Sequence, residues 1–344
     1  MRILTALTYY RPHTSGLTIY AERLAEALVG RGHEVTVLTS RHDPASALEE
    51  VRNGVRIRRV PVAFRLSKGV IMPSFGFVAT REVLRHDVQL LHLPQFDAAG
   101  LALRGRVLKR PTVVTYHCDL LLQPGPFNRI VNGAVTLANH LTARFAHRIV
   151  AYTEDFARHS PYLSRYAGKR TQILPPVHLP AADAAGFAAR AGDARQGGPV
   201  IGMATRLASE KGIEILLDAL PAVFERHPDA RVLYAGQYED VWGEQRYAAR
   251  LMPRIEEHQK AGRWKFLGVL EPAQMTAFFD AIDVLVVPSL NSTESFGLIQ
   301  IEAMLRGTPS VASDLPGVRQ PVRMTGMGRV VPVGDAPALA GAGG

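Results

Sequence analysis

The segment Pro288-Ser-Leu-Asn-Ser-Thr-Glu294-Ser-Phe-Gly-Leu-Ile-Gln-Ile-Glu302-Ala303 is the most informative part of this chain. An apolar run ends at Pro288, which predicts a strand buried on both faces. A polar loop follows, and a helix is predicted over Phe296–Arg306. Backbone N–H groups at a helix start favour anions such as a diphosphate. Glu294 precedes that start and Glu302 lies about two turns along the helix, where carboxylates can accept hydrogen bonds from sugar hydroxyls.

Two series of alternating strands and helices surround this segment. In the first half, short apolar runs predict strands over Arg2–Leu7, Glu34–Thr39, Val55–Val60, Leu90–Leu93, Pro111–His117, Arg148–Thr153 and Thr171–Leu174. In the second half, they predict strands over Val200–Thr205, Arg231–Ala235, Lys265–Val269, Val284–Pro288, Ser310–Ser313 and Arg329–Val333. Between these runs, helices are predicted over Thr18–Arg31, Gly212–Arg226 and Pro272–Ala281.

A proline-rich stretch, Leu174–Pro180, separates the two series. It is interpreted as a linker, extended by Ala/Gly-rich sequence to Gly198, because proline removes helix and ladder hydrogen bonds. The sequence therefore predicts an α/β protein with two doubly wound, Rossmann-like domains, residues 1–180 and 181–344, facing across a cleft. Ligands of such domains bind beyond the carboxyl ends of the strands. Little sequence follows Val333, so we expect the second domain to lack its final helix.

A second loop, Gly202-Met-Ala-Thr-Arg206-Leu-Ala-Ser-Glu-Lys211-Gly212, carries two cations at the end of a predicted strand. Arginine and lysine at such a position can clamp a diphosphate and stabilise a leaving nucleotide. A turn followed by a surface lysine would give the same pattern. The loop by itself therefore does not decide between a binding site and an ordinary surface.

Two loops of the first half are also candidates. Tyr10-Arg-Pro-His-Thr-Ser15-Gly16-Leu-Thr18 joins the first strand to the first long helix, and its small residues allow the backbone to approach a phosphate or sugar. His117 and Asp119 lie where a buried strand emerges. A lone histidine at a strand end is more often structural than functional, so His117 alone is a weak signal.

Together these loops resemble a known family. Glu294 and Glu302, with Ser295-Phe296-Gly297 between them, resemble the E-x7-E signature of the family 4 (group 1) retaining glycosyltransferases, which have the two-domain GT-B fold. The Arg206–Gly212 loop is similar to the R-L-x-x-x-K-G element of that family, and the Ser15-Gly16 loop to its P-x-x-G-G element. Two departures are Thr205 and Ser15, which stand where many members carry glycine. The motifs occur in the family's order along most of the chain.

The resemblance implies transfer of a hexose-type sugar from a UDP- or GDP-sugar to a glycan, lipid or small-molecule acceptor, with retention of anomeric configuration. The nucleotide sugar is a co-substrate, and no other cofactor is implied. Glu302 would hold the ribose, while Arg206 and Lys211 would bind the diphosphate. The implied catalytic residues are His117 and Glu294, and the implied donor-binding residues are Gly16, Arg206, Lys211, Val269, Ser295, Phe296, Gly297, Leu298 and Glu302. On the acceptor side we name Tyr9, Gln95 and Asp119.

Several sequence patterns are absent. The chain has no Asp-x-Asp, no clustered Cys/His spacing and no Walker-type loop. We therefore expect metal-independent transfer, with Arg206, Lys211 and the helix start at Phe296 in the role of a divalent cation. The single cysteine, Cys118, excludes a disulfide within the chain and fits a reducing cytoplasm. No run of about 18 apolar residues predicts a transmembrane helix.

The net charge of +9 is unevenly distributed. Residues 1–180 hold 24 Lys and Arg against 12 Asp and Glu, whereas residues 181–344 hold 16 against 19. The basic half favours an acidic partner, and an anionic membrane surface with a lipid-linked acceptor fits, which would place the protein on the inner face of the membrane. The candidate cations are Arg52, Arg56, Arg58, Arg59, Arg65, Lys68, Arg104, Arg106, Lys109 and Arg110. A generally arginine-rich composition explains the excess equally well.

Two other functions remain as alternatives. A nucleotide-sugar epimerase could use the same fold, although the full Glu294–Glu302 and Arg206–Lys211 set argues against it. A nucleic-acid-binding module would use the basic first half. No aromatic interleaving or helix-turn-helix motif accompanies those arginines, so we expect no nucleic-acid partner.

Overall fold

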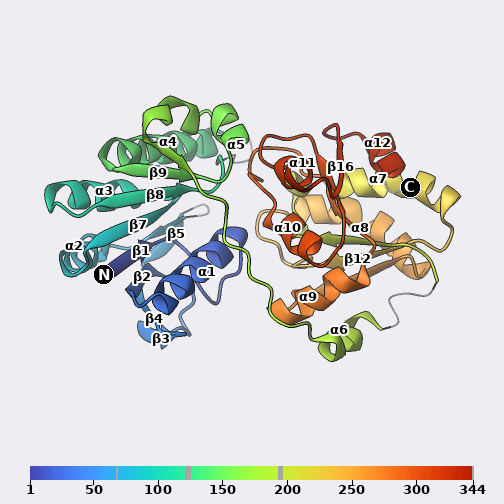
Figure 1. Ribbon diagram of the computed structural model, residues 1–344, viewed down its shortest axis with the longest axis horizontal. Helices are drawn as coiled ribbons and strands as arrows, with labels where there is room; N and C mark the ends of the chain where they lie inside the picture. The colour runs from blue at the N-terminus through green and yellow to red at the C-terminus, as the bar shows by residue number, and fades with distance from the viewer. Residues whose placement is uncertain (67–68, 121–124, 193–196, 343–344) are drawn as a thin grey trace. The chain divides into compact units, whose positions relative to one another are not determined.

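The structure is a computed structural model that describes residues 1–66, 69–120, 125–192 and 197–342. The chain divides into two compact units, Met1–Pro176 and Val177–Gly344 (Figure 1). Each unit contains a mostly parallel sheet with helices on both faces, which confirms the predicted α/β class with two Rossmann-like folds. The division falls at Pro176, inside the predicted linker.

The first unit is built on an eight-stranded sheet in the order β10-β9-β8-β7-β1-β2-β4-β3, in which β3 runs antiparallel to β4. Its strands are β1 (Arg2–Ala6), β2 (Glu34–Arg41), β3 (Glu49–Arg52), β4 (Val55–Pro61), β7 (Val88–Leu93), β8 (Thr112–Tyr116), β9 (Arg148–Ala151) and β10 (Arg170–Gln172). A separate hairpin pairs β5 (Phe64–Leu66) with β6 (Gly69–Ile71). The helices are α1 (Gly16–Gly30), α2 (Phe75–Arg85), α3 (Ala98–Val107), α4 (Pro126–Phe145), α5 (Glu154–His159) and the 3-10 helix η1 (Leu163–Lys169).

Strand residues of the first unit alternate between two cores because successive side chains of a strand point to opposite faces. Ile3 of β1 packs in the core that contains Ala21 and Ala25 of α1. The next residue, Leu4, packs in the core that contains Ala79 of α2. Strands with both faces covered favour apolar residues on both faces, which is why most of their sequences are rich in valine, isoleucine and leucine.

The second unit holds a parallel six-stranded sheet in the order β13-β12-β11-β14-β15-β16. Its strands are β11 (Val200–Ala204), β12 (Arg231–Ala235), β13 (Trp264–Gly268), β14 (Val284–Val287), β15 (Ser310–Ser313) and β16 (Gly328–Val331). The helices are α6 (Ala184–Ala191), η2 (Ser209–Lys211), α7 (Ile213–Arg226), α8 (Gln245–Lys260), α9 (Pro272–Ala281), α10 (Leu298–Leu305), α11 (Gln320–Thr325) and α12 (Ala336–Ala342). The expectation that no helix follows the last strand is wrong: a short helix, α12, follows β16, because its Leu339 and Ala340 pack in the same core as α7.

Each sheet reverses its strand order at one central strand. In the first unit β1 lies between β2 and β7, and in the second unit β11 lies between β12 and β14. Loops that leave such a strand diverge and leave a crevice at the carboxyl ends of the strands. The loops that follow β1, β11 and β14 carry Gly16, Arg206 with Lys211, and Glu294, respectively.

The predicted strands lie close to the observed ones, but other elements were not predicted. Helix α6 lies within the stretch that was interpreted as linker up to Gly198, so that part of the interpretation is wrong. The helix forms because the Asp183 side chain caps it, accepting a 2.9 Å hydrogen bond from the Gly186 amide. Strand β3, the β5–β6 hairpin and the long helix α4 were also missed.

Candidate active site

Two loops of the second unit pack together at the carboxyl ends of β11 and β14. Gly212 has a φ of +68°, and a Cβ atom placed on it would lie 2.0 Å from the carbonyl oxygen of Pro288. Only glycine fits so close an approach in that left-handed conformation. Beside this contact, the amide of Leu290 donates a 3.0 Å hydrogen bond to the carbonyl of Glu210. The first loop is therefore held against the second, which brings Lys211 next to Glu294.

Lys211 and Glu294 form an ion pair. Nζ of Lys211 lies 2.8 Å from Oε2 of Glu294, and the two side chains are only 16% and 25% exposed. The other carboxylate oxygen accepts a 3.0 Å hydrogen bond from the Gly297 amide, and the Phe296 amide also donates to this group. Burial opposes ionisation of Glu294, but the lysine charge and these donors outweigh it, so its pKa lies below the ordinary value. Glu294 is therefore an anion at neutral pH.

The turn before α10 fixes the direction of these amides. Helix α10 begins at Leu298, slightly later than predicted, because Gly297 adopts a left-handed φ of +74°. Gln300 is fully buried, and its Nε2 donates hydrogen bonds of 3.2 and 2.8 Å to the carbonyls of Phe296 and Val318. The buried side-chain amide of Gln300 joins the turn to the core, so the Gly297 N–H is held in a fixed position.

Other predicted donor-site residues of the second unit differ in exposure. Ser295 and Phe296 are buried, and Glu302 is only 8% exposed, so a solvated surface position for Glu302 is ruled out. Arg206 is about half exposed and pairs with Glu210 at 2.9 Å, not with Glu294. The structure thus brings Lys211 and Glu294 together at the start of α10. Arg206 lies closer to solvent and pairs with Glu210 instead.

Val269 also lies at a strand end of the second unit, just after β13. Its side chain is exposed, and its carbonyl oxygen accepts a 3.0 Å hydrogen bond from Arg190. The same guanidinium donates to the carbonyl of Leu267 at 3.3 Å. Arg190 therefore holds the backbone of the loop that contains Val269, one of the residues that the sequence resemblance nominates.

In the first unit, Gly16 is the first residue of α1. The Ser15 side chain caps this helix by accepting a 3.2 Å hydrogen bond from the Thr18 amide. Gly16 is exposed, and no atom would lie within 4 Å of a Cβ placed on it. A short ion pair between Arg11 and Glu22, with Nε 2.9 Å from Oε2, fastens the preceding loop to the helix. Local packing therefore does not require glycine at position 16.

His117 is buried at the end of β8, and both of its ring nitrogens have partners. Its Nε2 lies 2.8 Å from Nδ1 of His92 at the end of β7, and its Nδ1 is hydrogen-bonded to the hydroxyl of Tyr152. The ring of Tyr20 meets it edge-on, with 4.9 Å between centroids. Burial lowers the pKa of His117, as does the neighbouring His92, and burial lowers the pKa of His92 to about 3. Both imidazoles are therefore neutral at neutral pH.

His92 and Tyr152 were not identified from the sequence. His92 is one polar residue within the apolar strand Val88–Leu93, and a lone histidine there carries no motif. The signal that could have found it is the parallel pairing of β7 with β8, which places His92 beside Thr115 and brings its ring near His117. That pairing is a tertiary property.

The three predicted acceptor residues lie in different settings. Asp119 is buried, and its Oδ1 accepts hydrogen bonds from the hydroxyls of Tyr116 at 3.0 Å and Ser160 at 2.6 Å. Gln95 is also buried, and its Oε1 has no hydrogen-bond partner among the described residues. Tyr9 packs against the rings of two histidines, with 5.1 Å to His13 and 5.4 Å to His42. Asp119 therefore has a hydrogen-bonding role within the first unit.

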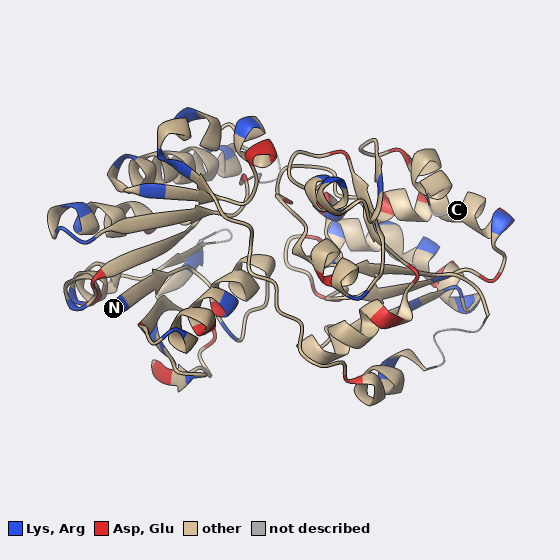
Figure 2. Ribbon diagram, viewed as in Figure 1, with Lys and Arg blue, Asp and Glu red and all other residues tan. Residues whose placement is uncertain are grey.

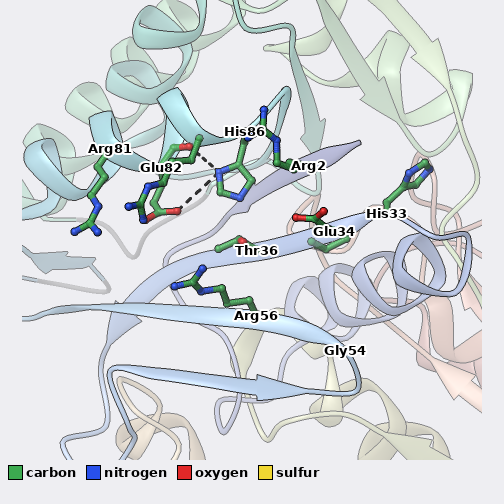
Figure 3. Close-up of a pocket in the computed structure, with 11 residues that line it drawn as sticks. Arg2, His33, Glu34, Thr36, Gly54, Arg56, Arg81, Glu82 and His86 are labelled. Atoms are coloured by element: carbon green, nitrogen blue, oxygen red, sulfur yellow. Dashed lines mark hydrogen bonds and ion pairs between the residues drawn. The ribbon is translucent and has the colours of Figure 1, made fainter.

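A separate cavity of about 740 Å³ lies at the opposite end of the first sheet, by the amino ends of β1, β2 and β4 (Figure 3). Its lining consists mainly of arginine, glutamate and histidine side chains: Arg2, His33, Glu34, Arg56, Arg81, Glu82, Arg85 and His86. Three of its four arginines already face carboxylates: Arg2 with Asp87 at 2.7 Å, Arg56 with Glu49 at 3.1 Å and Arg85 with Glu82 at 4.0 Å. This cavity is largely charge-balanced and contains none of the predicted site residues.

Several of the cations nominated for a membrane surface are engaged inside the fold. Arg59 is 5% exposed and donates to the carbonyls of Ala47 and Arg11. Arg58 pairs with Glu49 at 2.9 Å, and Arg104 donates to the hydroxyl of Thr80 at 2.8 Å. Arg58, Arg59 and Arg104 are thus committed to internal contacts, and Lys68 lies outside the described residues.

In the described parts of the chain, no group of three or more His, Cys, Asp or Glu side chains is arranged to hold a metal ion. No helix of those parts has both the length and the apolar character needed to cross a bilayer.

Comparison with known proteins identifies the family. Residues 188–342 match the model for glycosyl transferases group 1, and residues 15–176 match the glycosyl transferase 4-like domain. A phosphatidyl-myo-inositol mannosyltransferase of Mycobacterium tuberculosis is 31% identical over 349 residues, covering 98% of this chain and 84% of the relative. A 2-deoxystreptamine N-acetyl-D-glucosaminyltransferase of Streptomyces fradiae is 29% identical, covering 96% and 82%.

Solved structures agree with this assignment. Anabaena HepE in complex with UDP-glucose superimposes with a TM-score of 0.74 at 21% identity, covering 99% of this chain and 88% of that one. Sucrose-phosphate synthase from Thermosynechococcus elongatus gives a TM-score of 0.73 with the same identity and coverage. The fold and the two strand-end loops thus define a glycosyltransferase of the GT-B type. The chain belongs to the group 1 glycosyltransferases, family 4.

Proposed function

We propose that this glycosyltransferase moves a hexose-type sugar from a UDP- or GDP-sugar to a glycan, lipid or small-molecule acceptor, with retention and without a metal ion. The observation that carries the proposal is the Lys211–Glu294 pair at the start of α10. Nζ of Lys211 lies 2.8 Å from Oε2 of Glu294, which supports a role for the lysine toward a phosphate and for the neighbouring carboxylate toward sugar hydroxyls. Relatives that include mannosyltransferases, and a neighbour solved with UDP-glucose, support a hexose donor.

On the donor side, each residue of the second unit has a proposed role. Lys211 and Arg206 bind the diphosphate, and the buried Glu302 holds the ribose. Glu294 accepts hydrogen bonds from sugar hydroxyls, and the Ser295–Gly297 backbone places the ring. The lowered pKa of Glu294 supports this role, because an ionised carboxylate accepts hydrogen bonds and does not donate them.

In the first unit, Gly16 leaves room for the donor, and His117 contributes to the reacting centre. The neutral state of His117 and its two hydrogen bonds support a role in orienting the sugar, not in removing a proton. Tyr9, Gln95 and Asp119 remain our candidates on the acceptor side. The exposed backbone at Gly16 supports its part in this proposal.

In the reaction, the bond between the anomeric carbon and the phosphate oxygen breaks. A bond from the acceptor oxygen forms on the same face of the sugar, and the acceptor proton passes to the leaving phosphate oxygen. Cations beside the diphosphate stabilise the charge that develops on it. Much of the rate then comes from positioning and from this charge stabilisation.

The test begins with a thermal-shift panel of nucleoside diphosphates and nucleotide sugars. A ligand that binds only the folded state at about 100 times its Kd raises stability by about 2.7 kcal/mol. We expect one base series, uridine or guanosine, to raise Tm, and the transferred sugar to keep its anomeric configuration in the NMR coupling constants of the product. Transfer that persists in excess EDTA would support metal independence.

Several results would contradict the proposal. Absence of any shift across the panel would remove the donor assignment. A product with inverted anomeric configuration would contradict retention. Loss of activity in EDTA, with recovery when a metal ion is added, would contradict metal independence. An isomerised sugar formed from donor alone, without acceptor, would favour the epimerase alternative.

A further inference from the structure

Helix α4 exposes a continuous apolar stripe. Phe127, Ile130, Leu137 and Leu141 are 51%, 73%, 61% and 41% exposed, and Ala134 is exposed between them. Their spacing alternates between three and four residues, which places all five side chains along one side of the helix. Large apolar side chains scattered singly over a surface need no explanation, but a stripe along a whole helix indicates a contact partner.

This stripe is not the side by which α4 packs on its own unit. The buried positions of α4 are Ala138, Asn139, Thr142 and Ala143, and they face α3 and β8. The buried side is thus made of small and polar residues, whereas the exposed side carries the large apolar ones. Burial within the unit does not account for those large residues.

The charge around the stripe has one sign. Helix α4 carries Arg129 and Arg144 and no acidic residue. From Ala98 to Thr153 the sequence holds seven Lys and Arg and one acidic residue, Asp119, which is buried and hydrogen-bonded. Figure 2 shows Lys and Arg on α3 and α4 without Asp or Glu.

The positive charge near the stripe distinguishes between the partners that could cover it. A second copy of the chain would bring the same basic helices together, and like charges would oppose pairing. A nucleic acid would satisfy the arginines but would leave the apolar stripe uncovered. An anionic lipid surface satisfies both, since an amphipathic helix buries its apolar side at the headgroup boundary while its cations meet anionic headgroups.

We propose that α4 docks this protein on an anionic lipid bilayer, with Phe127, Ile130, Leu137 and Leu141 at the headgroup–acyl boundary. This proposal goes beyond sugar transfer and does not depend on the donor or the acceptor. It also adds a helix that the sequence had not nominated to the expected membrane contact, and it sets aside Arg58 and Arg59 of β4, which are engaged internally.

The test is co-sedimentation of the full chain with vesicles of phosphatidylglycerol and phosphatidylcholine, and with pure phosphatidylcholine. The first variant, Ile130→Glu with Leu137→Glu, removes two apolar anchors, and we expect it to weaken binding to anionic vesicles about tenfold or more. The second, Arg129→Glu with Arg144→Glu, removes the headgroup contacts, and its remaining binding loses most of its sensitivity to salt. All four positions are exposed, so both variants are expected to keep the wild-type circular dichroism spectrum and Tm.

Matched controls use the same changes elsewhere on the surface. Phe77→Glu alters a residue of α2 that is 76% exposed, and Arg31→Glu with Arg246→Glu reverses two other exposed cations. We expect both controls to bind like the wild type. Absence of wild-type binding to anionic vesicles, or unchanged binding of Ile130→Glu with Leu137→Glu, would overturn the proposal. A wild-type dimer in light scattering that this variant converts to a monomer would also overturn it, by assigning the stripe to a second copy.

Discussion

Nε2 of His117 lies 2.8 Å from Nδ1 of His92, and the opposite ring nitrogen of His117 is bonded to Tyr152. The resemblance to known glycosyltransferases had nominated His117 but neither His92 nor Tyr152. The structure adds the two neighbours that determine the orientation and protonation of its ring. Because both nitrogens are engaged in a buried site, a role as a free proton acceptor is disfavoured in this state.

These buried histidines predict how stability depends on pH. Their pKa values are lowered in the folded state, so the unfolded chain takes up protons first as the pH falls below about 6.5. Their stabilising contribution is therefore complete above pH 6.5 and is lost toward pH 3. The free energy of unfolding should fall between pH 6 and pH 5, and we expect this fall to be about 1 kcal/mol smaller in His92→Gln than in the wild type. Urea unfolding at each pH measures the free energy of unfolding.

The exposed His159 gives a control for that experiment. His159→Gln makes the same substitution at a histidine whose side chain is more than half exposed, so it controls for the exchange of histidine for glutamine itself. Histidines elsewhere contribute equally to both proteins. Equal slopes for His92→Gln and the wild type would show that His92 is not held neutral by the fold.

Glu294→Gln tests the carboxylate with little change of shape. The amide cannot carry the negative charge that faces Lys211, and it accepts hydrogen bonds more weakly than a carboxylate. We expect transfer to fall by roughly 10²–10³-fold, with stability lowered by about 1–2 kcal/mol through the lost ion pair. Initial rates and thermal unfolding measure the two effects. Glu257→Gln, on the exposed side of α8, is expected to behave like the wild type, and near-normal turnover in Glu294→Gln would refute the role of Glu294.

Substitutions of Lys211 and Arg206 should differ in their effects on stability. Lys211→Met leaves the Glu294 carboxylate partly buried without its cation, so we expect a loss of about 1–3 kcal/mol together with weaker diphosphate binding. Arg206→Met removes a half-exposed cation whose pairing with Glu210 contributes little, so stability should change by less than about 1 kcal/mol. Both should bind nucleoside diphosphates at least about tenfold more weakly, as calorimetry can measure. Equal affinity in Arg206→Met and the wild type would remove Arg206 from the site.

Two glycines offer a comparison between structural and functional constraint. Gly297→Ala forces a side chain into a φ of +74° and within 2.6 Å of Gln300, so we expect a loss of about 1–3 kcal/mol. Gly16→Ala meets no atom within 4 Å, so stability should stay within about 0.5 kcal/mol of the wild type. If Gly16 leaves room for the donor, Gly16→Ala still loses transfer activity. A fully active Gly16→Ala would show that the space is not used.

The two sheets could be predicted from the sequence because most of the buried strands are short runs dominated by apolar residues. Helix α9 was predicted with its observed bounds, since Pro272 stands at its first position, where proline is favoured. Helix α4 was missed although its apolar residues recur every three or four positions. Its packing side could not be predicted from that spacing, because the large apolar residues lie on the exposed side. Amphipathic periodicity predicts which side packs only when the apolar side is the buried one.

The site could be predicted only as a set of loops. Sequence position placed Lys211 and Glu294 on two loops of the same domain, but their pairing depends on the contact of Gly212 with Pro288. His92 has no distinguishing neighbours in its strand, so its role appears only when β7 lies beside β8. The burial of Glu302 likewise follows from the packing of α10, not from the local sequence.

The ion pair between Lys211 and Glu294 also has a consequence for product release under the proposed roles of the two residues. The diphosphate and Glu294 would then compete for the same lysine. A nucleoside diphosphate alone would displace Glu294 and leave it without a cation, whereas a nucleotide sugar would supply hydroxyls in place of the lost contact. After transfer, Glu294 would compete for Lys211 again, which would favour release of the used donor and limit product inhibition.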